Sequence, residues 1–276
     1  MNRLAATFAR LKKEGRSAFV PFITAGDPDM ETSAAILEQL PAAGADIIEL
    51  GAPFSDPMAD GPAVQASSMR ALKSGATMVK VLQMVARFRK TDKTTPIVLM
   101  GYYNSIHAYG TAKFVHDVAQ AGVDGLIVVD LPIEEDEVLR VPAKAQGVDL
   151  IRFVTPTTDE ARLKRIVADA SGYLYYVAVA GVTGTKQAPE AEIAAAMARV
   201  RAATTLPCTV GFGIRTPEQA AAVAALADGV VVGSAIVSLV AAHQAQGKDA
   251  VIAKVLELTR VLAGSTHAVR RDKVPA

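Results

Sequence analysis

The stretch AGVDGLIVVD, residues 121–130, contains the pattern that decides the fold. Its glycine follows an Ala-rich helical segment, a tight turn leads to Asp124, and an apolar run of Leu, Ile and Val follows Gly125. Glycine readily adopts the left-handed conformation that ends a helix, and an uninterrupted apolar run is typical of a parallel strand buried on both faces. The stretch therefore predicts the passage from a helix into a buried parallel strand.

Similar passages recur at residues 43–46, 146–149 and 226–229. Eight short β-branched runs alternate with Ala-rich helical patterns, and they occupy residues 18–24, 46–51, 96–101, 125–130, 149–154, 173–178, 207–212 and 229–233. After the seventh run, Thr216, Pro217 and Gln219 have the composition of a capping box and predict a helix start.

Eight strand-helix units without a linker favour the α/β class and a (β/α)8 barrel. An open doubly wound sheet, the alternative, would normally show a glycine-rich dinucleotide motif after the first strand, and residues 24–28 are not one. We expect a single-domain barrel over residues 1–264, with an extra N-terminal helix in the amphipathic segment 2–13. The polar C-terminal tail, residues 265–276, is expected to be poorly ordered.

Composition argues against several classes of partner. Of the 276 residues, 51% are hydrophobic and 21% charged, as in globular proteins, and 29 basic against 28 acidic residues leave a net charge of +1. Without a basic block, neither nucleic acid nor an anionic membrane is an expected partner. The apolar segment 229–242 is too short and interrupted to span a membrane. A single cysteine, Cys208, fits a reducing compartment, so we expect a cytoplasmic protein.

Glu49 stands near the end of the second predicted strand and is the first candidate for chemistry. Side chains alternate along a strand, so Glu49 lies on the face opposite to Ile48 and Leu50. If Leu50 faces the helices, Glu49 faces the barrel mouth, where the active sites of such barrels lie. Burying an unpaired carboxylate is unfavourable. Glu49 therefore either takes part in catalysis or forms an ion pair, for which Arg152 is the only cation in the other strands.

Glycines mark the ends of the last two predicted strands. Gly211 and Gly213 close the seventh strand, while Gly233 and Ser234 close the eighth and open a helical run. Because glycine lets backbone N–H groups approach an anion and a helix N-terminus favours negative charge, the two loops indicate a phosphate site, with simple tight turns as the alternative. The loop at residues 180–189 is either a mobile lid or an ordinary connection.

Other titratable residues indicate less. Asp60 and Asp56 could each serve a turn in the loop after the second strand, and a structural part is expected for Asp130. The predicted strands lack lysine, which argues against a Schiff-base aldolase, and the four histidines are too scattered for a metal site. Acid–base catalysis by carboxylates on a phosphorylated substrate is what remains.

Six motifs together extend this prediction. The longest is IELGAPFSDPMADGP at residues 48–62, and the others are PFITAGDP at 21–28, VDLP at 129–132, AGVTG at 180–184, GFG at 211–213 and GSAI at 233–236. Over essentially the whole chain, this set closely resembles the tryptophan synthase alpha subunit family.

The resemblance implies a lyase of tryptophan biosynthesis that cleaves indole-3-glycerol phosphate to indole and glyceraldehyde 3-phosphate, without a metal or cofactor of its own. It implies that Glu49 carries the proton and that Asp60 stabilises the indolenine cation through the indole N–H. A carboxyl that both donates and accepts a proton benefits from a raised pKa, which an apolar barrel mouth favours.

The resemblance also implies substrate contacts. Gly184, Gly213, Gly233 and Ser234 are expected at the phosphate, and Thr183 is expected on the lid, where it would orient Asp60. The residues implied around the indole and glyceryl portions are Phe22, Met100, Tyr102, Ile127, Tyr175 and Phe212.

A beta subunit that carries pyridoxal phosphate and consumes the indole is the implied partner, in an alpha-beta-beta-alpha heterotetramer. The implied contact residues are Pro53, Asp56, Pro57 and Asn104. Two positions depart from the common family pattern and bear on the lid and on the interface: Ala178-Val179 replaces Ser-Arg, and Ser105 replaces a proline.

Two alternatives stay open at this point. A phosphosugar isomerase on a similar barrel would not require the motif at residues 48–62. A non-catalytic barrel that binds the phosphorylated ligand and allosterically activates a partner enzyme would have little use for two acids at an apolar mouth.

Overall fold

A computed structural model describes residues 2–178, 189–211 and 213–271. Parallel strands form one sheet in the order β5-β4-β3-β2-β1-β9-β8-β7-β6. The strands are β1 (Ala18–Thr24), β2 (Ile48–Gly51), β3 (Ile97–Gly101), β4 (Gly125–Val128), β5 (Asp149–Leu150), β6 (Arg152–Val154), β7 (Leu174–Val177), β8 (Cys208–Gly211) and β9 (Gly229–Val232).

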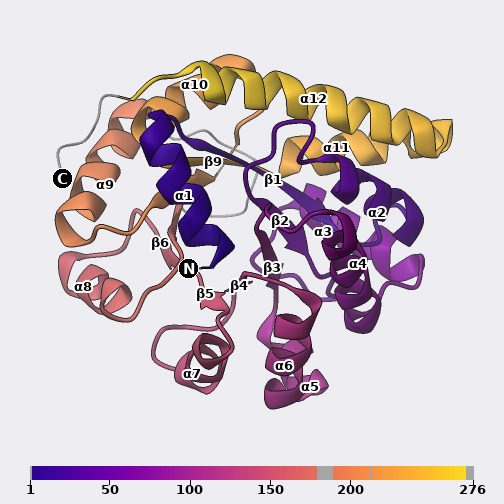
Figure 1. Cartoon of the computed structure of the whole chain (residues 1–276), viewed down its shortest axis with the longest axis horizontal. Coiled ribbons are helices and arrows are strands. Elements are labelled where there is room, and N and C mark those ends of the chain that lie inside the picture. Colours follow the sequence, from indigo (N-terminus) through magenta and orange to yellow (C-terminus); the bar gives the residue numbers. More distant parts are fainter. Residues whose placement is uncertain (1, 179–188, 212, 272–276) are drawn as a thin grey trace.

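Helices surround this sheet (Figure 1). They are α1 (Arg3–Glu14), α2 (Met30–Gln39), α3 (Pro62–Lys73), α4 (Met78–Thr91), α5 (Tyr103–Tyr109), α6 (Thr111–Ala121), α7 (Glu137–Ala145), α8 (Glu160–Ala168), α9 (Glu190–Ala203), α10 (Pro217–Leu226), α11 (Ser234–His243), the 3₁₀ helix η1 (Gln244–Gln246) and α12 (Lys248–Ala268).

The two edges of the sheet meet in one predicted strand. Residues 149–154 form both β5, which pairs with β4, and β6, which pairs with β7. This run therefore joins the ends of the sheet, and the expected single-domain (β/α)8 barrel is confirmed. The capping box at Thr216 and Gln219 is confirmed too, at the start of α10.

The glycine of the recurring passage behaves as expected in three of its four copies. Gly44, Gly122 and Gly147 have positive φ angles of 107°, 89° and 76°. The copy at residues 226–229 differs because α10 ends in the extended residue Ala227, and its glycine lies inside β9.

The aspartate of the passage anchors the strand entrances. Asp46 accepts a hydrogen bond from the backbone N–H of Phe19 in β1 at 3.0 Å, and Asp124 accepts one from Ile97 in β3 at 2.8 Å. Asp228 accepts one from the first residue of β8 at 2.9 Å. Each carboxylate thus satisfies a backbone donor of the neighbouring strand and ties two adjacent strands together where they begin.

Helix α1 closes the amino-terminal end of the barrel (Figure 1). Asn2 caps it by accepting a hydrogen bond from the Ala5 N–H at 3.0 Å. Leu4, Phe8 and Leu11, spaced along one helical face, pack against inward-facing strand residues. These residues, which lie in the strands or directly before them, are Ala18, Val20, Ile47, Val98, Ile127, Ile151, Tyr173 and Val231. The extra N-terminal helix is therefore confirmed, and it forms the floor of the barrel.

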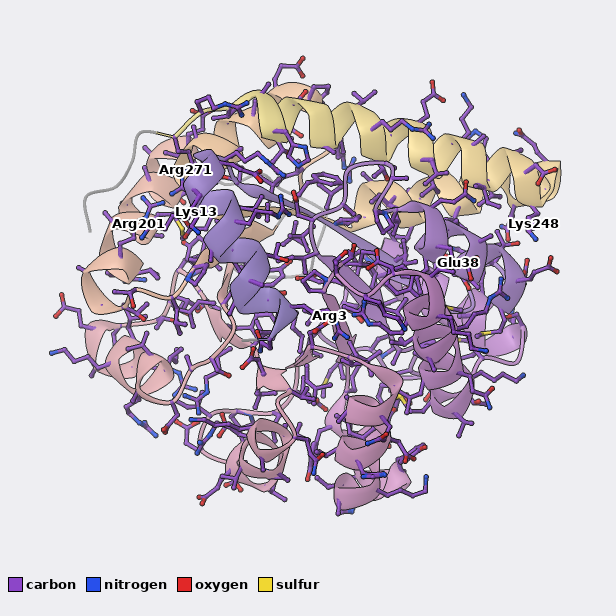
Figure 2. The ribbon with its side chains drawn as sticks, in the orientation of Figure 1. Arg3, Lys13, Glu38, Arg201, Lys248 and Arg271 are labelled. Atoms are coloured by element: carbon purple, nitrogen blue, oxygen red, sulfur yellow. The ribbon has the colours of Figure 1, made fainter. Side chains whose placement is uncertain are left out.

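A second core lies between the strands and the outer helices, and Ile48 and Leu50 of β2 belong to it. Charged side chains of both signs lie on the helices around the barrel (Figure 2). In the described part of the chain, no helix is both long and apolar enough to cross a lipid bilayer.

The C-terminal segment differs from the expectation of a poorly ordered tail that begins at Ser265. Helix α12 continues to Ala268 and buries Thr266 completely. His267 Nε2 lies 2.8 Å from a carboxylate oxygen of Asp46, which holds the end of the helix at the entrance of β2. Residues 272–276 of the expected tail lie outside the described residues.

Replacing Leu4 with alanine is expected to lower the free energy of unfolding by about 2–5 kcal/mol, because the lost methyl groups leave a cavity in the barrel floor. Urea denaturation followed by circular dichroism measures this change. Ala6→Gln, on the exposed side of the same helix, is the control and should change stability by less than about 0.5 kcal/mol. Equal stabilities of the two variants would mean that α1 adds nothing to the core.

Candidate active site

Glu49 lies inside the barrel, with 1% of its surface exposed. Its neighbours Ile48 and Leu50 point outward into the second core, as the strand alternation predicts. The hydroxyl of Tyr173 in the run before β7 donates a hydrogen bond to Glu49 Oε1 at 2.9 Å. The expected inward direction of Glu49 is confirmed.

The alternative of an ion pair between Glu49 and Arg152 is wrong. Arg152, the cation considered for it, points to the outer side of the sheet, where its Nη2 lies 2.6 Å from Asp136 Oδ2. Its Nη1 donates to the carbonyl of Ile166 in α8 at 2.7 Å. Side-chain alternation explains this direction, because Ile151 is the inward residue of that run.

Burial raises the pKa of Glu49 to about 8, although the hydrogen bond from Tyr173 acts in the opposite direction. Removal from water disfavours the charged form of a carboxyl, and a hydroxyl donor compensates only in part. Glu49 is thus mostly protonated near neutral pH and becomes a comparatively strong base once it gives up its proton.

Asp60 lies in the loop between β2 and α3, with 6% of its surface exposed. Its backbone N–H donates to the carbonyl of Pro57 at 3.0 Å, and Gln65 Nε2 donates to its carbonyl at 2.9 Å. Burial raises the pKa of Asp60 to about 6, and a hydrogen bond with Tyr102 partly opposes this. The second acid is therefore largely ionised at neutral pH while Glu49 is not.

Glu49 and Asp60 line one cavity at the carboxyl ends of the strands. Its volume among the described residues is about 80 Å³. The predicted site residues that line it are Phe22, Glu49, Asp60, Met100, Tyr175, Gly213, Gly233 and Ser234. Residues that sequence reasoning missed are Val64, Ile214 and Val231 in the lining and Tyr173 behind Glu49. Tyr173 could have been found, because it stands two residues before Tyr175 and so on the same face of the strand.

Two glycines make room for the aromatic walls of this cavity. A Cβ atom at Gly211 would lie 1.9 Å from the hydroxyl oxygen of Tyr175, and one at Gly51 would lie 2.7 Å from Cζ of Phe22. Such distances are far inside van der Waals contact. Both positions must therefore lack a side chain if Phe22 and Tyr175 are to keep their places.

Residues of the two loops for which the sequence predicts a phosphate site line the cavity. Gly233 is the N-cap of the ten-residue helix α11, which Ser234 begins. The first N–H groups of a helix have no partner within it, and the positive end of its dipole faces the cavity that Ser234 lines. Gly213, with a φ angle of 70°, lines the same cavity from the loop after β8. These groups can bind an anion.

Other predicted residues lie elsewhere. Tyr102 is behind Asp60, where its hydroxyl accepts a hydrogen bond from the Ala59 N–H at 3.0 Å and its ring stacks on Phe54. Ile127 is fully buried in the inner core. Thr183, Gly184, Phe212 and the loop at residues 180–188 lie outside the described residues.

The predicted partner residues lie near the mouth. Asp56 and Asn104 are exposed, Pro53 is half-buried and Pro57 is buried. Asp130 has the structural part expected of it, because its Oδ1 accepts a hydrogen bond from the Tyr103 N–H, at the start of α5, at 2.8 Å.

Comparison with known proteins places this geometry in context. The family model described as "Tryptophan synthase alpha chain" matches residues 8–267. The chain is similar to the solved tryptophan synthase subunit alpha from Legionella pneumophila str. Paris, with 40% identity, a TM-score of 0.90 and coverage of 98% of this chain and 100% of that one. A Mycobacterium tuberculosis tryptophan synthase structure matches with 33% identity, a TM-score of 0.85 and coverage of 97% and 99%.

Glu49→Gln is expected to change how stability depends on pH. The pKa of Glu49 is about 8 in the folded chain against an ordinary value of 4.5, so its contribution is fully present below pH 4.5 and is lost as the pH rises through 8. Between about pH 5.5 and about pH 7.5, the free energy of unfolding of the variant should rise relative to the parent by up to about 1.4 kcal/mol per pH unit.

Urea denaturation of both proteins across this pH range provides the measurement. Glu135→Gln, which removes an exposed carboxylate, serves as the control and should show a nearly constant difference from the parent. A constant difference for Glu49→Gln as well would mean that the Glu49 carboxyl is not perturbed by burial.

Proposed function

This chain belongs to the tryptophan synthase alpha chain family, and from that premise we propose that Glu49 and Asp60 are its catalytic residues. The protein is a lyase that cleaves indole-3-glycerol phosphate to indole and glyceraldehyde 3-phosphate in tryptophan biosynthesis. One observation carries the assignment of residues: two buried acids with pKa values of about 8 and about 6 line one cavity beside a helix N-terminus.

Glu49 transfers the proton in this proposal. Its protonated carboxyl donates to C3 of the indole ring and generates an indolenine cation. The carboxylate that results then accepts the proton of the glyceryl hydroxyl, the bond between C3 and the glyceryl carbon breaks, and its electron pair returns to the indole. A carboxyl whose pKa lies near the working pH suits both steps.

Asp60 stabilises the cation. Its carboxylate accepts a hydrogen bond from the indole N–H, and this bond strengthens as positive charge develops on the ring. The lower pKa of Asp60 supports this division of labour, because the stabilising group must be ionised while the donor is neutral.

The remaining cavity residues hold the substrate. Ser234, Gly233 and Gly213 bind the phosphate, together with Gly184. Phe22, Met100, Tyr175 and Phe212 contact the indole and glyceryl portions, with Tyr102 and Ile127 supporting them from behind, and Thr183 orients Asp60. Fixing the phosphate positions the reacting carbon beside Glu49, which lowers the entropic part of the barrier.

The alpha subunit has no cofactor, and pyridoxal phosphate belongs to the beta subunit with which it pairs. We propose an alpha-beta-beta-alpha assembly in which Pro53, Asp56, Pro57 and Asn104 contact the beta subunit. The exposed positions of Asp56 and Asn104 support this. A cytoplasmic location is proposed as well, since a single buried cysteine needs no oxidising compartment.

A non-catalytic barrel that only activates a partner enzyme is not favoured. Such a protein would keep Glu49 buried, with no cation beside it in the part of the chain that the structure describes, which lowers stability above neutral pH and brings no compensating gain.

Glu49→Gln is expected to lower the rate of indole release by about 10²–10⁴-fold, because glutamine cannot transfer the proton. Asp60→Asn should lower it by about 10²-fold or more, because the amide no longer offsets the positive charge. Indole release by the isolated chain, repeated with a beta subunit present, is the assay. Both variants should still bind glycerol 3-phosphate, and Glu135→Gln should keep full activity. Turnover of either variant near the parent rate would remove that residue from the mechanism.

Ser234→Asp is expected to raise KM for indole-3-glycerol phosphate by about tenfold or more, with a smaller change in kcat, because a second negative charge repels the phosphate. Ser238→Asp, at an exposed position of the same helix, provides the matched control. An unchanged KM in Ser234→Asp would place the phosphate elsewhere.

A further inference from the structure

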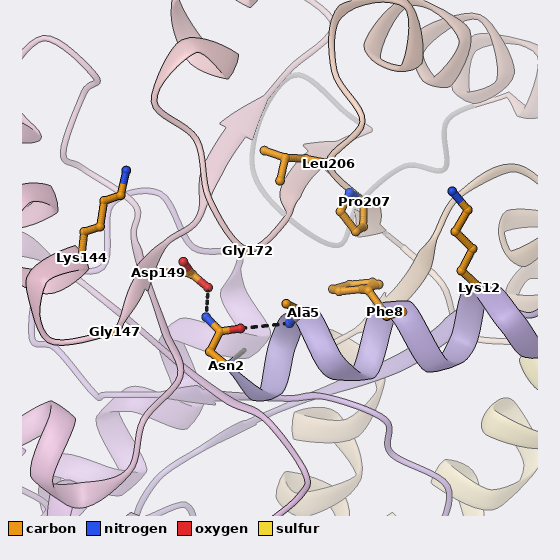
Figure 3. A pocket seen from close by; sticks show the side chains of 11 residues that line it. Asn2, Ala5, Phe8, Lys12, Lys144, Gly147, Asp149, Gly172, Leu206 and Pro207 are labelled. Carbon is orange, nitrogen blue, oxygen red and sulfur yellow. Dashed lines mark hydrogen bonds between the residues drawn. The ribbon is translucent and has the colours of Figure 1, made fainter. Parts of the chain in front are cut away.

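A second cavity, which we call the basal cavity, lies at the amino-terminal end of the barrel, opposite to the cavity that Glu49 lines. Its volume is about 510 Å³, within the range of small-molecule sites. Helix α1 supplies Phe8 and Lys12, the strand entrances supply Asp149, Leu206 and Pro207, and α7 supplies Lys144 (Figure 3).

Apolar side chains form the middle of the basal cavity. The ring of Phe8 lies near Pro207 and Leu206, between the two lysines (Figure 3). Aromatic and proline rings offer flat surfaces on which another planar group can pack.

Among the residues that line the basal cavity, two positive side chains, Lys12 and Lys144, outnumber one negative side chain, Asp149. Asn2 Nδ2 donates a hydrogen bond to the Asp149 carboxylate, while Asn2 Oδ1 accepts from Ala5, so this acid is hydrogen-bonded but keeps its negative charge. Lys12 and Lys144 are exposed, and within residues 2–178, 189–211 and 213–271 neither forms a salt bridge. Two ammonium groups on opposite sides of an apolar wall are complementary to an acidic molecule with a flat body.

We propose that the basal cavity binds a small organic anion with an aromatic body. Its acidic group pairs with Lys12 or Lys144, and its ring packs on Phe8, Leu206 and Pro207. This site is separate from the catalytic cavity, since the two share no lining residue among those that the structure describes.

An occupant of the basal cavity would contact two neighbours of Tyr173, the residue that donates a hydrogen bond to Glu49. The rings of Phe8 and Tyr173 are 5.7 Å apart between centroids, and Gly172, the neighbour of Tyr173, lines the cavity directly. Tyr173 in turn donates its hydroxyl hydrogen bond to Glu49. Two contacts therefore connect the site to the catalytic acid, and this link, unlike the binding itself, rests on the proposed function of Glu49.

Titration of the full chain with 1-naphthoate, followed by calorimetry, tests binding. The anion should bind at least about tenfold more tightly than 1-naphthylmethylamine, which has the same ring and the opposite charge. The double variant K12Q/K144Q should weaken naphthoate binding by about fivefold or more. K13Q/K90Q removes two exposed lysines outside the cavity and should leave it unchanged.

Ala9→Phe distinguishes the basal cavity from the catalytic one. Ala9 lines the basal cavity from the exposed side of α1, so a phenyl ring there should fill the site and abolish naphthoate binding while glycerol 3-phosphate binding persists. Ala6→Phe, on the same helix but outside the lining, should bind naphthoate like the parent. Naphthoate binding that is undiminished in Ala9→Phe or in K12Q/K144Q would overturn the site.

The link to Glu49 has its own readout in the pH profile of indole release. Saturating naphthoate should shift the apparent pKa of turnover in the parent and leave the Ala9→Phe profile unshifted. An unshifted profile in the naphthoate-saturated parent would overturn the link. If naphthoate did not bind as expected while Glu49→Gln still lost indole release, the basal site would be wrong and the proposed function would stand.

Discussion

The exclusion of water from a single carboxyl group governs the site. Within the described residues, Glu49 is held inside an apolar barrel without a cation beside it, and the hydroxyl of Tyr173 donates a hydrogen bond to it. An ion pair would have kept the carboxyl ionised. Asp46 shows this effect, because its contacts with His267 and Arg16 lower the pKa of the Asp46 carboxyl to about 2. The same chemical group is thus an acid donor in one environment and a structural anion in the other.

The two ends of the barrel contribute differently to this environment. At the amino-terminal end, aspartates bind backbone donors of neighbouring strands and α1 fills the floor, so that stability resides there. At the carboxyl end, Gly51 and Gly211 leave space that Phe22 and Tyr175 occupy. The residues that stabilise the fold and the residues of the catalytic cavity therefore lie at opposite ends of the barrel.

Periodicity along the chain was sufficient for the fold and for the direction of Glu49, because strand alternation and glycine helix ends are local properties. It was not sufficient for contacts between distant residues. The bond from Tyr173 to Glu49 spans 124 positions, and strand alternation alone does not identify Asp136 as the partner of the outward-facing Arg152. The end of α12 was missed for the same reason, since a polar sequence at residues 265–268 gives no sign of the Asp46 carboxylate that holds His267.

The central claim is that burial keeps Glu49 protonated at neutral pH. Its most direct test is ¹³C NMR titration of the glutamate side-chain carboxyl groups, with the Glu49 resonance assigned by its absence from the spectrum of Glu49→Gln. The structure predicts an apparent pKa of about 8 for this resonance. A pKa near 4.5, the ordinary value for glutamate, would show that the carboxyl is solvated or paired with a cation and would contradict the account.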